Sequence, residues 1–128
     1  MTSGELAQAI DAVEEAYEYM LAYAAQGRSG GDDDDSIRGY LKRAEAALRV
    51  IAGATVQSAG SADADPADEA FLDIVRADAA RARAAMRFVL ARRAIGSQMI
   101  DNLNASIHLR ALLTDLFLLD EALKISGV

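Results

Sequence analysis

The spacing of the apolar side chains constrains the fold more than any other feature of this sequence. Along most of the chain they recur every three or four residues, which places them on one face of an α-helix. The first such segment contains Leu6, Ile10, Val13, Tyr17, Met20 and Ala24. Hydrophobic residues make up 52% of the 128 residues but aromatic residues only 5%, and alanine, the best helix former, supplies the difference. An all-α fold is therefore predicted.

Two loops and one turn divide this pattern into four predicted helices, at about 3–26, 36–58, 66–95 and 97–125. Thr2 and Glu5 have the spacing of a capping box, and Asp65 followed by Pro66 is typical of a helix start. Gly96 is interpreted as a tight turn, and one long helix running through it is the alternative. Short links between four helices favour a single-domain antiparallel up-down-up-down four-helix bundle over residues 1–128.

The last predicted helix is apolar on two sides. One stripe comprises Ile100, Leu103, Ile107, Ala111, Leu118 and Ile125, and the other comprises Leu112, Leu116, Leu119 and Leu123. A helix of this kind is buried on more than one side, either at the centre of the fold or against another chain. In so small a protein we expect the second arrangement. The four leucines of the second stripe are therefore predicted to form an interface, in a homodimer or a larger assembly.

Tyr19 and Tyr23 are a second candidate contact surface. They are spaced i,i+4 and face away from the apolar row of the first segment. Exposed tyrosines are good anchors for a protein partner because they are large and amphipathic. Half-buried packing at the edge of the bundle explains them equally well.

The charge balance and the absence of cysteine exclude several classes of protein. Thirteen Lys and Arg residues against twenty Asp and Glu residues give a net charge of −7, the wrong sign for a general nucleic-acid or anionic-membrane binder. A chain without cysteine forms no disulfide scaffold and no thiolate metal site. No uncharged apolar run is long enough to cross a membrane, and the first residues lack the basic start of a signal peptide. We expect a cytoplasmic protein without a cofactor.

Arginines in the third predicted helix are a candidate anion-binding site. Arg76, Arg83 and Arg87 share one face, at positions i, i+7 and i+11. The rigid guanidinium fork matches phosphate and carboxylate groups. The alternative is that these side chains form ion pairs with the acidic first helix.

A candidate polar site surrounds the only histidine, His108. Asp101 and Asp115 lie seven residues to either side of it, so all three are predicted on one face of the last helix. A carboxylate beside an imidazole can orient it for acid–base chemistry. The alternative, which we favour, is a polar strip at the edge of the bundle or a buried, hydrogen-bonded histidine. The spacing is not that of helical metal ligands, and the sequence lacks the Glu-x-x-His motif of di-metal bundles. No metal site is predicted.

Two functions follow from these patterns. Apolar surface beyond what one core needs, without a catalytic motif, favours a non-catalytic protein–protein interaction module such as an adaptor, an assembly factor or an inhibitor. The alternative is a small helical bundle that binds or acts on an anionic small molecule through the three arginines and His108. Enzymatic activity is the less favoured of the two.

Overall fold

The computed structural model describes residues 1–31, 35–59 and 65–125, and for residues 35 and 123–125 it describes the backbone alone. Within these ranges the chain forms five α-helices and no β-strand: α1 (Ser3–Ala24), α2 (Asp35–Ile51), α3 (Pro66–Leu90), α4 (Ser97–Ala105) and α5 (Ile107–Ile125). The predicted all-α class is confirmed. The prediction of four helices is wrong, because the segment 97–125 consists of α4 and α5 rather than one helix.

Ser106 separates α4 from α5. Its backbone is extended, with φ −64° and ψ 142°, and its N–H donates to the carbonyl oxygen of Leu103 (3.1 Å). Its Oγ accepts a hydrogen bond from the N–H of Leu109 (3.3 Å). The same serine therefore ends one helix and caps the next, as its short polar side chain allows. The apolar spacing continues through this position, which is why the sequence pattern does not reveal the break.

The predicted starts of the first and third helices are confirmed. Oγ1 of Thr2 accepts a hydrogen bond from the N–H of Glu5 (3.1 Å), and Oδ1 of Asp65 accepts one from the N–H of Ala67 (2.7 Å). The predicted turn before residue 97 is also confirmed. Gly96 is the N-cap of α4, so one helix running through it is excluded.

The predicted helices extend too far at their C-terminal ends. α1 ends at residue 24 instead of 26, α2 at 51 instead of 58, and α3 at 90 instead of 95. After α2, residues 52–59 form turns in which two hydroxyl side chains hold the backbone. The N–H of Thr55 donates to Oγ of Ser58 (2.7 Å), and the N–H of Ser58 donates to Oγ1 of Thr55 (3.1 Å). Such local hydrogen bonds compete with helical ones.

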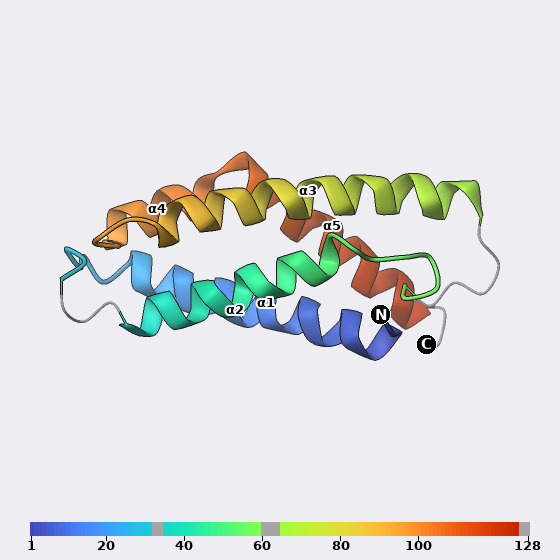
Figure 1. The fold of residues 1–128 in the computed structure, drawn as a ribbon, viewed down its shortest axis with the longest axis horizontal. Coiled ribbons are helices and arrows are strands. Elements are labelled where there is room, and N and C mark those ends of the chain that lie inside the picture. Colours follow the sequence, from blue (N-terminus) through green and yellow to red (C-terminus); the bar gives the residue numbers. More distant parts are fainter. Residues whose placement is uncertain (32–34, 60–64, 126–128) are drawn as a thin grey trace.

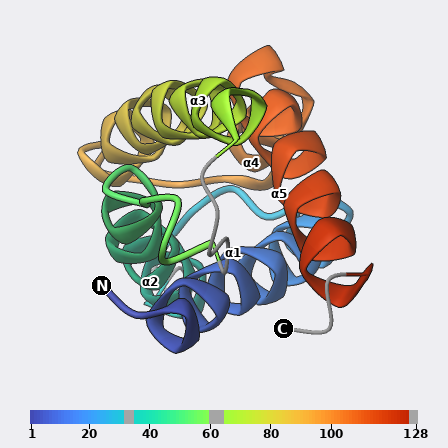
Figure 2. The ribbon, with the colours of Figure 1, turned by 90° about the vertical axis from the view of Figure 1, so that its right-hand side faces the viewer.

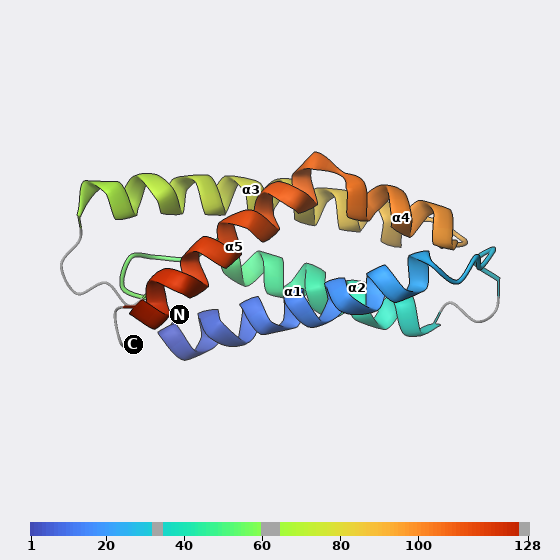
Figure 3. The ribbon, with the colours of Figure 1, turned by 180° about the vertical axis from the view of Figure 1, so that it is seen from behind.

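The helices form two layers around a shared core (Figure 1). α1 and α2 pack against each other in one layer, and α3 and α4 lie in the other. α5 runs diagonally from the end of α4 toward the start of α1 (Figure 3). Seen from the end, it closes the side of the molecule between α3 and α1 (Figure 2), and it packs mainly against α3.

Apolar side chains from all five helices fill one core. The largest fully buried ones are Tyr23, Leu6, Ile10, Met20, Ile37, Leu41, Leu48, Ile51, Met86, Ile95, Ile100 and Leu109. Leu6, Ile10 and Met20 belong to the apolar row predicted for the first segment, because helical spacing places these residues on one side of the helix.

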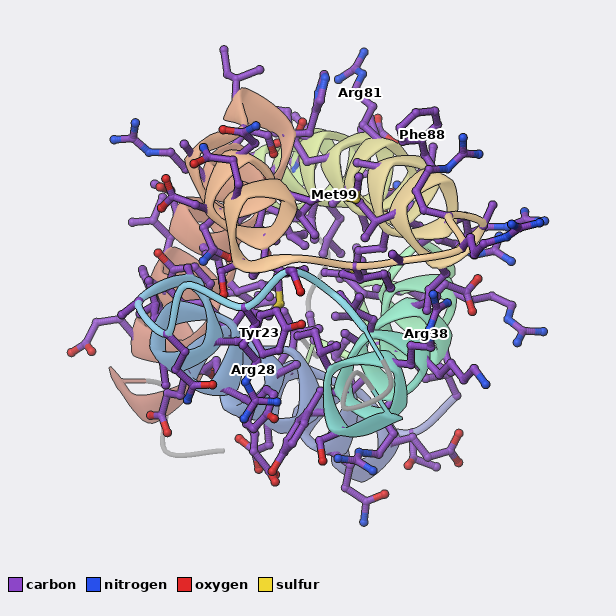
Figure 4. All side chains as sticks on the ribbon, turned by 90° about the vertical axis from the view of Figure 1, so that its left-hand side faces the viewer. Tyr23, Arg28, Arg38, Arg81, Phe88 and Met99 are labelled. Atoms are coloured by element: carbon purple, nitrogen blue, oxygen red, sulfur yellow. The ribbon has the colours of Figure 1, made fainter. Side chains whose placement is uncertain are left out.

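The connections that follow α1 and α3 lie against each other at one end of the molecule (Figure 4). The N–H of Ser97 donates to the carbonyl oxygen of Arg28 (2.9 Å), and the N–H of Arg28 donates to Oγ of Ser97 (2.8 Å). Gly30 beside them has φ +84°, and a Cβ there would lie 2.7 Å from the backbone of Ile95. Both the positive φ and the close approach require glycine. This junction joins the two layers.

Candidate functional site

The first arginine of the predicted anion-binding row is engaged within the molecule. Arg76 donates to the carbonyl oxygen of Ala54 (2.6 Å) and forms ion pairs with Asp73 (2.5 Å) and Glu69 (2.8 Å). The hydrogen bonds to Asp73 and Glu69 raise the pKa of Arg76. Arg76 therefore ties α3 to the chain that follows α2.

The other two arginines do not complete an open anion site with it. Nε of Arg83 donates to Oε1 of Glu45 in α2 (2.6 Å), and both side chains are half-buried. Arg87 is exposed in the last turn of α3, where the helix dipole favours a cation. The intramolecular interpretation is thus correct for Arg76 and Arg83. Their partners lie in α2 and α3, however, rather than in the acidic first helix.

Sequence analysis missed a further arginine between the same two helices. Arg38 of α2 donates to the carbonyl oxygens of Leu90 (3.1 Å), Arg92 (2.7 Å) and Arg93 (2.9 Å) at the end of α3. These carbonyls have no partner inside a helix that ends there. Arg38 thus caps α3 from a neighbouring helix, and no local sequence pattern indicates such a cap.

The predicted polar site around His108 does not form. His108 and Asp101 are exposed, whereas Asp115 is buried, and the break at Ser106 separates the helix of Asp101 from that of the other two. The predicted common face depended on one continuous helix. In the described part of the chain, no three or more Asp, Glu or His side chains are grouped to hold a metal ion.

Asp115 instead faces Asp78 of α3, at the seam between α3 and α5. Asp115 is only 8% exposed, and the side chain of Asp78 is 14% exposed and pairs with Arg81 (3.4 Å). Burial, together with the hydrogen bond to Asp78 and the charge of Asp78, raises the pKa of Asp115 to about 7. Asp115 therefore keeps its proton over much of the range below neutral pH. Oδ2 of Asp115 receives no hydrogen bond from any described residue.

The two candidate tyrosines lie mostly inside the protein. Tyr23 is buried, and its hydroxyl donates to the carbonyl oxygen of Ile95 (2.5 Å). Tyr19 is half-buried and stacks on Tyr40 of α2, with ring centroids 4.2 Å apart. Figure 4 shows Tyr23 beside the junction of the two connections. The prediction of Tyr23 as a contact surface is corrected, because its hydroxyl joins the two layers.

The predicted leucine interface is also corrected. Leu112, Leu116 and Leu119 are buried in the core of the chain itself, and the side chain of Leu123 lies outside the described residues. α5 turns these leucines inward because it lies diagonally across the open side of the other helices (Figure 2). The apolar surface that α5 leaves to solvent belongs to other residues.

Six exposed residues form what we call the α5 outer face. They are Ile107, Arg110, Thr114, Phe117, Leu118 and Glu121, and they fall within roughly 100° of the helix circumference. Ile107 is 75% exposed, Phe117 54% and Leu118 58%. Two of these belong to the first predicted stripe, whose earlier members Ile100 and Leu103 are buried in α4. Its apolar side chains thus lie at the start and in the middle of the face, with Arg110 and Thr114 between them and Glu121 after them.

The outer side of α3 adds two more exposed apolar side chains. Ile74 is 52% exposed and Phe88 61% exposed, with Arg81 midway between them in sequence. Figure 4 shows Arg81 and Phe88 pointing away from the interior. The guanidinium carbon of Arg92 lies 4.3 Å from the centre of the Phe88 ring, so this aromatic side chain already has a cationic neighbour.

None of the helices in the described part of the chain is long and apolar enough to span a membrane.

Comparison with known proteins identifies no relative of this chain. No protein-family model matches the sequence, no curated protein is significantly similar to it, and no solved structure matches its fold.

Proposed function

We propose that this protein is a non-catalytic interaction module, an adaptor, assembly factor or inhibitor, which binds a protein chain through the outer sides of α3 and α5. The observation that carries the proposal is the exposure of Ile74, Phe88, Ile107, Phe117 and Leu118, each by half or more. These side chains lie on two helices that pack against each other. Scattered apolar residues are normal on a surface, whereas a contiguous group of large ones marks a binding surface, and we propose that these five residues form such a group.

The composition of this surface also suits a protein partner. Two of its apolar side chains are phenylalanines, and Arg81, Arg92 and Arg110 lie on the same two helices or next to them. Aromatic residues and arginine are enriched in protein–protein interfaces and supply most of their binding energy. The net charge of −7 argues against direct nucleic-acid binding. We further propose a cytoplasmic location, in keeping with a chain that has no cysteine.

The alternative function, binding of an anionic small molecule, is weakly supported because two of the three arginines that it requires have partners within the chain. It depends on three arginines and His108 acting together, and Arg76 and Arg83 already bind groups of the chain itself. No observation in the structure favours it independently.

Photo-crosslinking tests the proposed function. A photoreactive phenylalanine analogue replaces Phe117 or Phe88, both of which are exposed aromatic positions, and Glu15 on the exposed side of α1 serves as the matched control. On illumination in cells, we expect a specific protein adduct from position 117 and from position 88, and none from position 15. Equal labelling from all three positions, or no adduct from any of them, would contradict the proposal.

A further inference from the structure

We propose that the α5 outer face binds the α5 outer face of a second copy of this chain, with the two helices antiparallel about a two-fold axis. This inference rests on the proposed function and narrows it by naming the partner of α5. It follows from the order of charged and apolar residues along the face. Arg110 lies near the start of the helix, Glu121 lies near its end, and Phe117 and Leu118 lie between them.

Neither charge on this face has an ion-pair partner among the described side chains. Arg110 and Glu121, which carry these charges, are both exposed. The face as a whole has one cation and one anion, so its own net charge is zero although the chain has a net charge of −7. Two copies therefore meet where their local charges do not repel, which is a condition for association of like-charged molecules.

The positions of these charges select the orientation. An axis midway between Thr114 and Phe117 sets Arg110 of each copy opposite Glu121 of the other, because the two residues lie at equal distances from that axis. Two identical ion pairs then flank the contact, as in any two-fold interface. A parallel arrangement would instead set arginine opposite arginine and glutamate opposite glutamate, which is unfavourable.

The same axis also brings the apolar side chains of the two copies together at the centre of the contact. Thr114 of one copy lies opposite Phe117 of the other, so a small side chain faces each aromatic ring. Phe117 and Leu118 of both copies gather around the axis, where water is excluded best. Between the two ion pairs the interface thus has an apolar centre, which is the usual anatomy of a protein–protein interface. Ile107 lies outside the ion pairs, about one turn before Arg110.

The outer side of α3 is less suited to self-association. Its exposed aromatic residue, Phe88, already has the guanidinium of Arg92 against its ring, and Arg81 pairs with Asp78. The described residues on the outer side of α3 therefore do not place an unpaired cation at one end of an apolar centre and an unpaired anion at the other. Because of this difference between the outer sides of α3 and α5, we place the second copy on α5.

Charge reversal tests the inference on the full chain. Sedimentation velocity over a range of concentrations should show a monomer–dimer equilibrium for the wild type. Arg110→Glu or Glu121→Arg alone sets like charges against each other twice, so each should raise the dissociation constant by about tenfold or more. Both changes suit the helix dipole, since they put an acid near the start of α5 and a base near its end. The monomer should therefore stay folded, and far-UV circular dichroism checks this.

Recombination of the charges identifies the antiparallel register. The double variant Arg110→Glu/Glu121→Arg should dimerise like the wild type. A mixture of the two single variants should form heterodimers, because one copy then presents two acids and the other two bases. Arg49→Glu, which changes the net charge as Arg110→Glu does but at an exposed position of α2, is the control for that variant and should leave dimerisation unchanged.

Two results would overturn the inference. One is a wild type that stays monomeric at every concentration, and the other is a mixture of single variants that associates no better than either alone. A specific photo-crosslink from position 117 to a different protein would then support the proposed function and reject the dimer. Loss of both the dimer and the crosslinks would remove the two proposals together.

Discussion

The two flanks of α3 differ in how their polar groups are satisfied. On the side of α2, Arg83 pairs with Glu45, Arg76 reaches the carbonyl oxygen of Ala54, and Arg38 caps the end of α3. On the side of α5, the carboxyl groups of Asp78 and Asp115 face each other, and the pKa of Asp115 is raised to about 7. We refer to these contacts as the α2–α3 seam and the α3–α5 seam.

This difference distinguishes a seam whose polar groups find partners within the chain from a seam where two carboxyl groups face each other. In the α2–α3 seam, each of these arginines meets an acid or a carbonyl oxygen of the same chain. The α3–α5 seam combines a buried proton-dependent pair with exposed apolar side chains on its outside. We expect the α3–α5 seam to respond to pH and, under the proposed function, to a partner, whereas we expect the α2–α3 seam to stabilise the fold. Three predictions test this comparison.

The largest effect is expected inside α5. Leu116→Asp buries a charge at a fully enclosed core position and should lower the free energy of unfolding by about 4 kcal/mol or more. Phe117→Asp, one residue further and exposed, should change it by about 0.5 kcal/mol or less while it weakens self-association. Urea denaturation followed by far-UV circular dichroism measures both. Similar losses for the two variants would contradict the inner and outer sides assigned to α5.

An intermediate effect is expected in the α2–α3 seam. Arg38→Leu removes three charge-assisted hydrogen bonds to carbonyl oxygens, and should cost about 1.5–3 kcal/mol of stability. Lys42→Leu removes the same charge from an exposed position of the same helix and should cost less than about 0.5 kcal/mol. Thermal denaturation compares the two. Equal stability of the two variants would show that Arg38 does not cap α3.

The smallest effect is expected from the carboxyl pair, and it depends on pH. The pKa of Asp115 is about 7 in the folded chain against an ordinary value of 3.8, so between these pH values the folded state binds a proton that the unfolded state has released. The free energy of unfolding should therefore fall as the pH rises from 4 to 7. Asp115→Asn, which needs no proton to donate to Asp78, should reduce this slope and stabilise the protein by about 1–2 kcal/mol at alkaline pH.

Denaturation curves at several pH values measure that slope. Asp101→Asn is the matched control, because it removes the same charge from an exposed position of α4, and it should keep the wild-type slope. If the two variants behaved alike, net charge rather than the buried pair would explain the pH dependence.

The starts of α1 to α4 were predictable from the sequence, whereas the start of α5 and most of the helix ends were not. Thr2 and Asp65 accept hydrogen bonds from backbone N–H groups three and two residues away, and Pro66 has a backbone φ that suits the first turn of a helix. Local chemistry therefore determines where α1 and α3 begin. The end of α3 depends on Arg38, which is 52 residues distant from Leu90. No local pattern contains that information.

The inner side of α5 could not be predicted for a different reason. Leu116 and Phe117 are both apolar, and adjacent residues point about 100° apart on a helix. Where both directions are apolar, periodicity alone does not decide which one faces the core. The break at Ser106 decides it, since it sets the direction of α5 independently of α4. For the same reason the sequence could not bring Asp78 and Asp115 together.

The stacking of Tyr19 on Tyr40, with Tyr23 adjacent, has a practical consequence for spectroscopy. The chain contains no tryptophan, and its four tyrosines all lie within residues 17–40. Ultraviolet fluorescence and near-UV circular dichroism therefore report on α1 and α2, and they are nearly silent on α5. Comparison of the tyrosine signal with the far-UV helical signal would separate the opening of α5 from the unfolding of the whole chain, without any introduced label.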